Sequence, residues 1–247
     1  MDLIKTKSFQ LATISRGDVH ADKLAIMLPG RLDTKDYASC VSHIEYLAGK
    51  GYFAVSFDPP GTWDSPGGIE LFTTTNYIKA VTELMDHYGN KPTLLIGHSR
   101  GGATAILAGA THPFVTSIVA IMASYGAPSL PKPESLKTGV QIEYRDLPPG
   151  LQETPEQKWF ALPLNYFKDG KQYNVVRSLQ TCTKPKLLVY GTRDKFTKPE
   201  RVKEVFKLIP EPKMLLEVNS DHDHRYHPEV IDEVNGAIGE FLLKYSI

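Results

Sequence analysis

Short apolar runs alternate with segments of helical length along this chain, and this alternation restricts the fold more than any other feature. A strand that passes through a helix into the next strand forms a right-handed crossover, so the pattern predicts a mostly parallel sheet with helices on both faces. The apolar runs are expected to be strands and cover residues 24–28, 53–57, 93–96, 118–122, 187–190 and 214–218. The helices are expected at residues 36–48, 75–88, 99–111, 199–208 and 228–245.

The pentapeptide Gly97-His98-Ser99-Arg100-Gly101 stands where one of these strands passes into a helix. A reversal within so few residues strains the backbone at Ser99 and lifts its hydroxyl above the sheet. Glycine is expected at both ends, because a Cβ there would meet the neighbouring strand or helix. This context predicts that Ser99 is a catalytic nucleophile, and the plain alternative is an inert serine in a turn.

A serine hydroxyl is a weak nucleophile at neutral pH, so this hypothesis requires a histidine base and a carboxylate that orients it. Asp194 follows the strand at 187–190 and is the candidate acid. It could instead cap the next helix, but Thr197 is placed better for that role, before the proline that starts the helix. Asp194 is therefore expected to be free for catalysis.

The candidate base is His222, in the loop that follows the strand at 214–218. His224 and His227 lie in the same loop and remain alternatives.

The run from 221 to 224 also resembles a metal site, because alternate residues of an extended segment share one face. A catalytic metal needs at least three ligands and no second cluster stands out, so we expect neither a metal nor a cofactor.

The interval from Tyr125 to Arg177 interrupts the alternation of strands and helices. It is rich in proline and aromatic residues, and no strand is expected within it. An insertion of roughly fifty residues exceeds an ordinary loop and predicts a small helical lid, placed over the crevice at the carboxyl ends of the strands. Its aromatic residues, including Trp159 and Phe160, are expected either to line a substrate pocket or to form the core of the lid.

The amino-acid composition limits the classes of binding partner and the cellular location that the chain is expected to have. Lys plus Arg and Asp plus Glu number 28 each, so no overall charge favours a nucleic acid or an anionic membrane as partner. Two cysteines, Cys40 and Cys182, are too few for a disulfide framework, which favours a reducing cytoplasm. No segment has the length and apolarity of a signal peptide or a membrane span. We expect a soluble, cytoplasmic, single-domain protein over residues 1–247, and the sequence gives no indication of its oligomeric state.

The strand-flanked pentapeptide and the chain order Ser99, Asp194, His222 resemble the α/β-hydrolase family over nearly the whole chain. The nearest branch is the one that contains serine-aminopeptidase-like hydrolases, monoacylglycerol-lipase-like enzymes and cinnamoyl or feruloyl esterases. Members carry a His-Gly oxyanion loop after an early strand, and residues 28–31, Leu-Pro-Gly-Arg, match it. The resemblance implies an oxyanion hole made of main-chain N–H groups, those of residues 31 and 100.

Two residues depart from the family pattern. Pro29 replaces the usual histidine of the oxyanion loop. Members also often carry Asp-x-x-Gly-x-Gly-x-Ser after the next strand, matched here by residues 58–65, in which Trp63 replaces a glycine. Neither change removes a catalytic atom, so both bear on loop geometry and substrate fit. The side chains of Arg31 and Arg100 are candidates to bind a substrate carboxylate or phosphate, with surface ion pairs as the alternative.

The resemblance implies a serine hydrolase that cleaves a carboxylic ester or thioester of a small to medium apolar acyl or aryl group. An amide or peptide hydrolase and an acyltransferase would use the same three residues. A ligand receptor that has kept the fold and lost the chemistry is the alternative from another class. The expected partner is a small-molecule ester.

Overall fold

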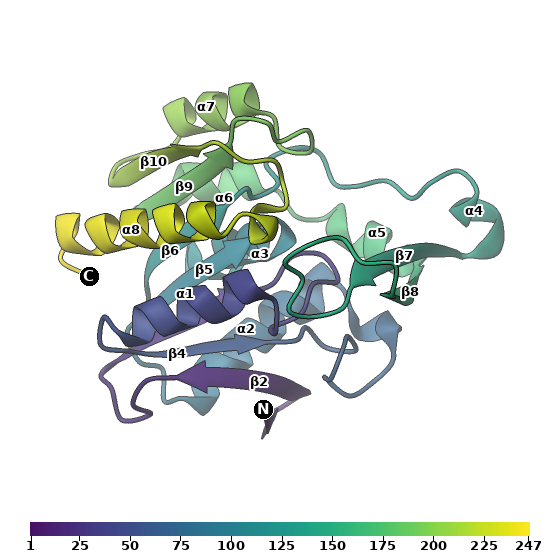
Figure 1. The fold of residues 1–247 in the computed structure, drawn as a ribbon, viewed down its shortest axis with the longest axis horizontal. Coiled ribbons are helices and arrows are strands. Elements are labelled where there is room, and N and C mark those ends of the chain that lie inside the picture. The colour runs from purple at the N-terminus through teal and green to yellow at the C-terminus, as the bar shows by residue number, and fades with distance from the viewer.

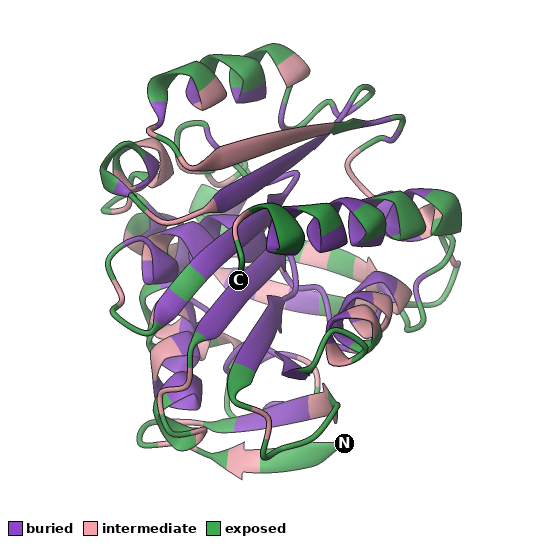
Figure 2. Cartoon of the chain, turned by 90° about the vertical axis from the view of Figure 1, so that its left-hand side faces the viewer, coloured by how far each residue is buried: buried purple, intermediate pink, exposed green.

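A computed structural model describes residues 1–247, and its centre is an eight-stranded sheet (Figure 1). The strand order is β1-β2-β4-β3-β5-β6-β9-β10, and all pairs from β4 to β10 are parallel. The central strands are buried on both faces, which explains their continuous apolar runs (Figure 2). The strands are β1 (Asp2–Lys5), β2 (Gln10–Arg16), β3 (Lys23–Leu28), β4 (Tyr52–Phe57), β5 (Thr93–His98), β6 (Val115–Ile121), β9 (Lys186–Gly191) and β10 (Lys213–Val218).

Helices cover both faces of this sheet, and each face has its own apolar core. On one face lie α1 (Ala38–Ala48) and α8 (Pro228–Lys244), which stand in front of the sheet in Figure 1. On the other face lie α2 (Thr74–His87), α3 (Arg100–Gly109), α6 (Val175–Thr181) and α7 (Pro199–Leu208). The predicted α/β-hydrolase arrangement of a mostly parallel sheet between helices is confirmed.

The two N-terminal strands are additional to the expected ones. β1 pairs antiparallel with β2, and β2 pairs antiparallel with β4. β1 is the edge strand, and β2 lies between it and β4. Both strands are partly exposed, so their residues lack the apolar continuity of the inner strands.

Proline marks the start of two helices. Pro199 and Pro228 occupy the first helical positions of α7 and α8, where a missing N–H costs nothing. The expectation that Thr197 caps α7 is wrong, because the helix begins at Pro199 and Lys198 takes the capping position without a side-chain hydrogen bond.

The insertion between β6 and α6 contradicts the expectation that it holds no strand. It contains an antiparallel hairpin of β7 (Val140–Asp146) and β8 (Gln157–Pro163), together with the short helices α4 (Ser135–Thr138) and α5 (Leu164–Gly170). Polar and apolar residues alternate in β7, a period-2 signal of a half-buried strand that prolines on either side obscured. Figure 1 shows α4 at the outer end of the insertion, away from the sheet.

A buried lysine braces the loops at the carboxyl ends of β3 and β4. The ammonium of Lys35 lies 3.1 Å from a carboxylate oxygen of Asp58 and 2.7 Å from those of Asp36 and Asp64. Burial alone would lower the pKa of Lys35, but these three carboxylates raise it above its ordinary value. The loop that follows β3 is therefore fixed to the loop that follows β4.

None of the helices has the length and apolar character needed to cross a membrane.

We expect Lys35→Met to lower the free energy of unfolding by about 3–5 kcal/mol, because Asp58 would remain buried without its cation. Lys79→Met is the matched control, since Lys79 is half-exposed and its nearest carboxylate oxygen, on Glu83, is 3.9 Å away. Urea unfolding of both variants measures the difference. A loss of less than about 1 kcal/mol for Lys35→Met would contradict the bracing role.

Candidate active site

Ser99 stands at the turn between β5 and α3 in a strained conformation. Its φ is +51° and its ψ is −112°, and its N–H donates to the carbonyl of Ile121 at 2.8 Å. A Cβ on Gly97 would overlap the main chain at Gly101, and one on Gly101 would overlap the carbonyl oxygen of Leu28. The expected strain and the steric need for both glycines are confirmed.

His222 lies within hydrogen-bond distance of both predicted partners. Its Nε2 is 2.8 Å from the hydroxyl oxygen of Ser99, and its Nδ1 is 2.8 Å from an oxygen of Asp194. Since the carboxylate only accepts, Nδ1 carries the proton and Nε2 is left to accept the proton of the serine hydroxyl. The three residues predicted as a triad thus form one hydrogen-bonded series, with His222 between Ser99 and Asp194.

The carboxylate of Asp194 is buried and fully engaged. One oxygen contacts His222, and the other accepts the N–H groups of Phe196 and Thr197 at 2.8 and 2.9 Å. Burial alone would raise the pKa of Asp194, but the hydrogen bond from His222 and these N–H groups hold it below its ordinary value. The same carboxylate therefore shapes its own loop and orients the imidazole.

The other two histidines of this loop take different positions. His224 is buried and its ring lies against His43 and His98, with ring-centre distances of 5.7 and 4.8 Å. His227 is partly exposed and lies 3.5 Å from an oxygen of Asp221. Neither hydrogen-bonds Ser99.

The run from 221 to 224 does not converge as a metal site. His224 turns into the core, and no group of three or more His, Cys, Asp or Glu side chains is arranged to hold a metal ion.

The two predicted oxyanion donors have main-chain N–H groups without an acceptor in the protein. Arg31 follows β3 and Arg100 is the first residue of α3, and neither N–H takes part in a hydrogen bond. Tyr77 steadies the first of these loops by donating its hydroxyl proton to the carbonyl of Pro29 at 3.0 Å. Both N–H groups are thus unpaired at the carboxyl ends of β3 and β5, where an oxyanion could accept hydrogen bonds from them.

The side chains of these two arginines are engaged within the protein. The guanidinium of Arg31 is 3.0 Å from a carboxylate oxygen of Glu143. That of Arg100 donates to the hydroxyl of Thr74 and lies 5.3 Å from the ring centre of Tyr166. Arg31 thus forms the ion pair that was the alternative, whereas Arg100 forms none and contacts Thr74 and Tyr166.

Trp63 adopts the conformation that the glycine of the family motif would favour. Its φ is +47°, and its indole N–H donates to the carbonyl of Leu32 at 2.7 Å. The indole also packs edge-on against Phe160 at a ring-centre distance of 5.7 Å. The departure from glycine therefore adds a contact between the oxyanion loop and the insertion.

Trp159 and Phe160 are neighbours on β8, so they face opposite sides of the hairpin. Phe160 is 6% exposed and belongs to the core, whereas Trp159 is 62% exposed. The two side chains do not share one wall of a substrate pocket. A contact of either with substrate stays a prediction.

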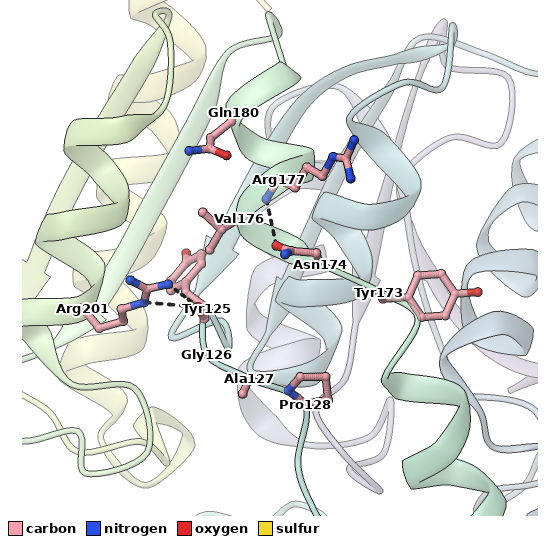
Figure 3. A pocket seen from close by; sticks show the side chains of 10 residues that line it. All are labelled: Tyr125, Gly126, Ala127, Pro128, Tyr173, Asn174, Val176, Arg177, Gln180 and Arg201. Atoms are coloured by element: carbon pink, nitrogen blue, oxygen red, sulfur yellow. Dashed lines mark hydrogen bonds between the residues drawn. The ribbon is translucent and has the colours of Figure 1, made fainter.

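Two cavities lie at the carboxyl ends of the strands. One of about 390 Å³ is beside the base and is lined by Arg193, Lys195, Phe196, Asp221, His222 and Asp223. The other, of about 300 Å³, follows β6, the neighbour of the strand that leads to Ser99. Its walls include Tyr125 and Val176, and Figure 3 shows the guanidinium of Arg201 against the carbonyl of Tyr125 while that of Arg177 points away.

The sequence motifs did not identify one buried neighbour of the candidate triad. His98 is buried beneath the base, and its Nε2 lies 2.8 Å from the carbonyl oxygen of His222. Asp33 and Arg145 extend this contact to the oxyanion loop and to β7. The position of His98 beside Ser99 was the only sequence signal, because the three residues are far apart along the chain.

Comparison with known proteins agrees with this geometry. A family model described as the alpha/beta hydrolase fold matches residues 25–145. The mitochondrial palmitoyl-protein thioesterase ABHD10 of Mus musculus is 23% identical over 213 residues, which cover 81% of this chain and 68% of that protein.

Solved structures extend the likeness to nearly the whole chain. Est1E of Butyrivibrio proteoclasticus with bound ferulic acid has a TM-score of 0.76 at 20% identity, covering 99% of this chain and 98% of its own. The mouse alpha/beta hydrolase domain-containing protein 10 also has a TM-score of 0.76, at 21% identity and the same coverage. The fold is that of an α/β-hydrolase. The sequence pattern of that family is matched over residues 25–145, and the likeness of fold extends over the rest of the chain.

We expect Phe160→Ala to lower the free energy of unfolding by about 3–5 kcal/mol, because it leaves a cavity beside Trp63. Trp159→Ala, on the exposed face of the same strand, is expected to change it by less than about 1 kcal/mol. Thermal and urea unfolding of the two variants check the contrast. Equal losses would contradict the inward orientation of Phe160.

Proposed function

We propose that this protein is a serine hydrolase that cleaves a carboxylic ester or thioester of a small to medium apolar acyl or aryl group. The observation that carries the proposal is the hydrogen-bonded series from the hydroxyl of Ser99 through His222 to Asp194, with 2.8 Å at each step. The strained turn at Ser99 supports it, because strain at a solvent-facing hydroxyl is typical of a nucleophile.

In this mechanism the oxygen of Ser99 attacks the substrate carbonyl while Nε2 of His222 takes the hydroxyl proton. Asp194 stabilises the imidazolium that forms and holds its ring in place. The main-chain N–H groups of Arg31 and Arg100 donate to the developing oxyanion. His222 then gives its proton to the leaving alcohol or thiol, and water activated by the same imidazole releases the acid from Ser99.

The names of the similar proteins support an ester or thioester as the bond that is cleaved. The mouse relative is named a palmitoyl-protein thioesterase, and the Est1E structure contains ferulic acid, an aryl carboxylic acid. Since thioesters and oxygen esters pass through the same acyl-enzyme, one site serves both. We place the acyl group in the cavity of about 300 Å³ beside Tyr125 and Val176, whose size suits a small ligand.

A small-molecule ester is the proposed partner. The cytoplasmic location stays a prediction, and the name of the mouse relative places that protein in mitochondria. An amide hydrolase, an acyltransferase and a ligand receptor are distinguished from an esterase by experiment.

We expect Ser99→Ala to lower the turnover of p-nitrophenyl acetate by about 10⁴-fold or more with the fold intact, because only binding and oxyanion contacts remain. His222→Ala is expected to be nearly as damaging, and Asp194→Asn to be strongly impaired. His227→Ala is the matched control in the same loop and is expected to keep activity within about threefold. Steady-state kinetics and circular dichroism measure both properties.

A fluorophosphonate probe provides the decisive reading, since it labels an activated serine irrespective of the natural substrate. Labelling of the parent protein and none of Ser99→Ala supports the hydrolase. A protein that binds esters without being labelled is a receptor. Activity of Ser99→Ala within tenfold of the parent protein would refute the assignment of Ser99.

We expect Val176→Trp to fill part of the cavity in Figure 3 and to shorten the preferred acyl chain. Relative to the parent protein, kcat/KM for longer p-nitrophenyl esters should fall by about tenfold or more, while that for the acetate changes by less than about twofold. Val176→Ala, which enlarges the same wall, serves as the opposite control. An equal effect of Val176→Trp on all chain lengths would show that the cavity does not hold the acyl group.

A further inference from the structure

His98, the residue before Ser99, contacts the main chain that carries the base. Its side chain is 7% exposed, and its Nε2 is 2.8 Å from the carbonyl oxygen of His222. Since a carbonyl oxygen only accepts, Nε2 of His98 carries a proton and donates it. The ring therefore fixes the position of the loop that carries the imidazole of His222.

The second ring nitrogen of His98 faces a buried carboxylate. Its Nδ1 lies 3.6 Å from an oxygen of Asp33, whose side chain is 11% exposed. Gly30 permits this approach, because a Cβ there would overlap the carboxylate of Asp33. Burial would lower the pKa of His98, but the carboxylate raises it above its ordinary value. This arrangement favours protons on both nitrogens, because only the imidazolium is attracted to the carboxylate.

The same carboxylate connects the oxyanion loop with the hairpin. The other oxygen of Asp33 is 3.3 Å from Nε of Arg145 on β7, and that Nε also donates to the carbonyl of Arg31 at 2.9 Å. Burial would raise the pKa of Asp33, but His98 and Arg145 hold it below its ordinary value. The carboxylate thus stays ionised between two cations.

Two further histidines continue the stack away from the base, and both favour the neutral form. Burial lowers the pKa of His43 to about 4 and that of His224 well below its ordinary value, and the charge of His98 acts in the same direction. His43 contacts the side-chain oxygen of Asn235 at 2.7 Å, and Nδ1 of His224 has no partner. Among these three buried rings, only His98 has a carboxylate beside it.

Other charged groups around this cluster come from the loop of the base. Asp223 favours the protonated form of His98, and Arg225 favours the ionised form of Asp33. His222 faces the ring of His98 at a ring-centre distance of 5.1 Å.

We propose that His98 is a positioning residue that acts as an imidazolium. It fixes the loop that carries the base relative to the oxyanion loop. Its Nε2 proton fixes the main chain of His222, and its Nδ1 proton attracts Asp33, two residues after the oxyanion donor Arg31. This role rests on the proposed function, because it concerns the relative position of the nucleophile's base and the oxyanion donors.

Loss of the Nδ1 proton turns a lone pair toward the carboxylate of Asp33, so attraction becomes repulsion. A raised pKa means that the attraction is present at lower pH and is lost as pH rises through the pKa of His98. The pH profile of kcat reports the groups that must keep one protonation state during turnover. We therefore expect the alkaline side to report His98.

The test is the pH profile of p-nitrophenyl acetate hydrolysis from about pH 5 to about pH 9, with kcat and KM measured separately. His98→Gln keeps an N–H toward the carbonyl of His222 but cannot titrate. Asp33→Asn removes the charge that favours the imidazolium. His87→Gln, an exposed histidine on α2, is the matched control.

The parent protein should lose kcat at alkaline pH with little change in KM. His98→Gln should keep kcat at pH 7 within about fivefold and lack the alkaline decline, and Asp33→Asn should move the decline to lower pH by about one unit or more. His87→Gln should follow the parent protein. The proposal would be overturned if both site variants kept the alkaline decline of the parent protein. A kcat that falls by the same factor at every pH, and so keeps that decline, would count in the same way.

A second measurement is independent of activity. In the parent protein labelled with ¹⁵N-histidine, one of the eight rings should remain doubly protonated above the ordinary histidine range. The signal should be absent in His98→Gln and should titrate at lower pH in Asp33→Asn. Fluorophosphonate labelling of Ser99 tests the proposed function separately from the role of His98. A protein that is not labelled refutes the hydrolase. Eight histidine rings that are all neutral at pH 8 refute the imidazolium.

Discussion

The close approach of the first turn of α3 to the end of β3 is the constraint on which the site depends. Only a residue without a Cβ fits at Gly101, because its neighbour there is the carbonyl oxygen of Leu28. This contact places the N–H of Arg100 beside the loop that carries the N–H of Arg31. It also leaves Ser99 at a positive φ above the sheet. The positions of the candidate nucleophile and of the candidate oxyanion donors thus depend on one backbone contact.

The base reaches this turn from a loop whose position is determined by polar contacts. Asp194 holds the imidazole of His222 from one side, and His98 holds its main chain from beneath. Buried polar contacts of this kind are directional, whereas apolar packing tolerates small shifts. The three catalytic candidates come from three different loops, so directional contacts account for the 2.8 Å spacing better than packing does.

Residue pattern predicted the inner sheet and the triad candidates, since both leave local signals. Strands buried on both faces need continuous apolar runs, and a strand-to-helix turn needs glycine at fixed positions. The hairpin of β7 and β8 was missed because its apolar residues alternate with polar ones in a proline-rich segment. The lysine cluster at Lys35 and the histidine stack left no local signal. Their members meet only through the fold, which brings His43, His98 and His224 together from three separate elements.

Ion pairs, together with the packing of Phe160 against Trp63, hold the hairpin on the oxyanion loop. The inward positions of β7 include Glu143 and Arg145, which pair with Arg31 and Asp33, and Asp146 pairs with Arg225 at 2.8 Å. Apolar residues in these positions would tolerate a shift in strand register, whereas a buried ion pair loses several kcal/mol, of the order of 3–5, when one partner is displaced. Because Asp33 also faces His98, a displaced hairpin would change the charge beside the ring that supports the base. The insertion and the catalytic loops therefore form one electrostatic unit.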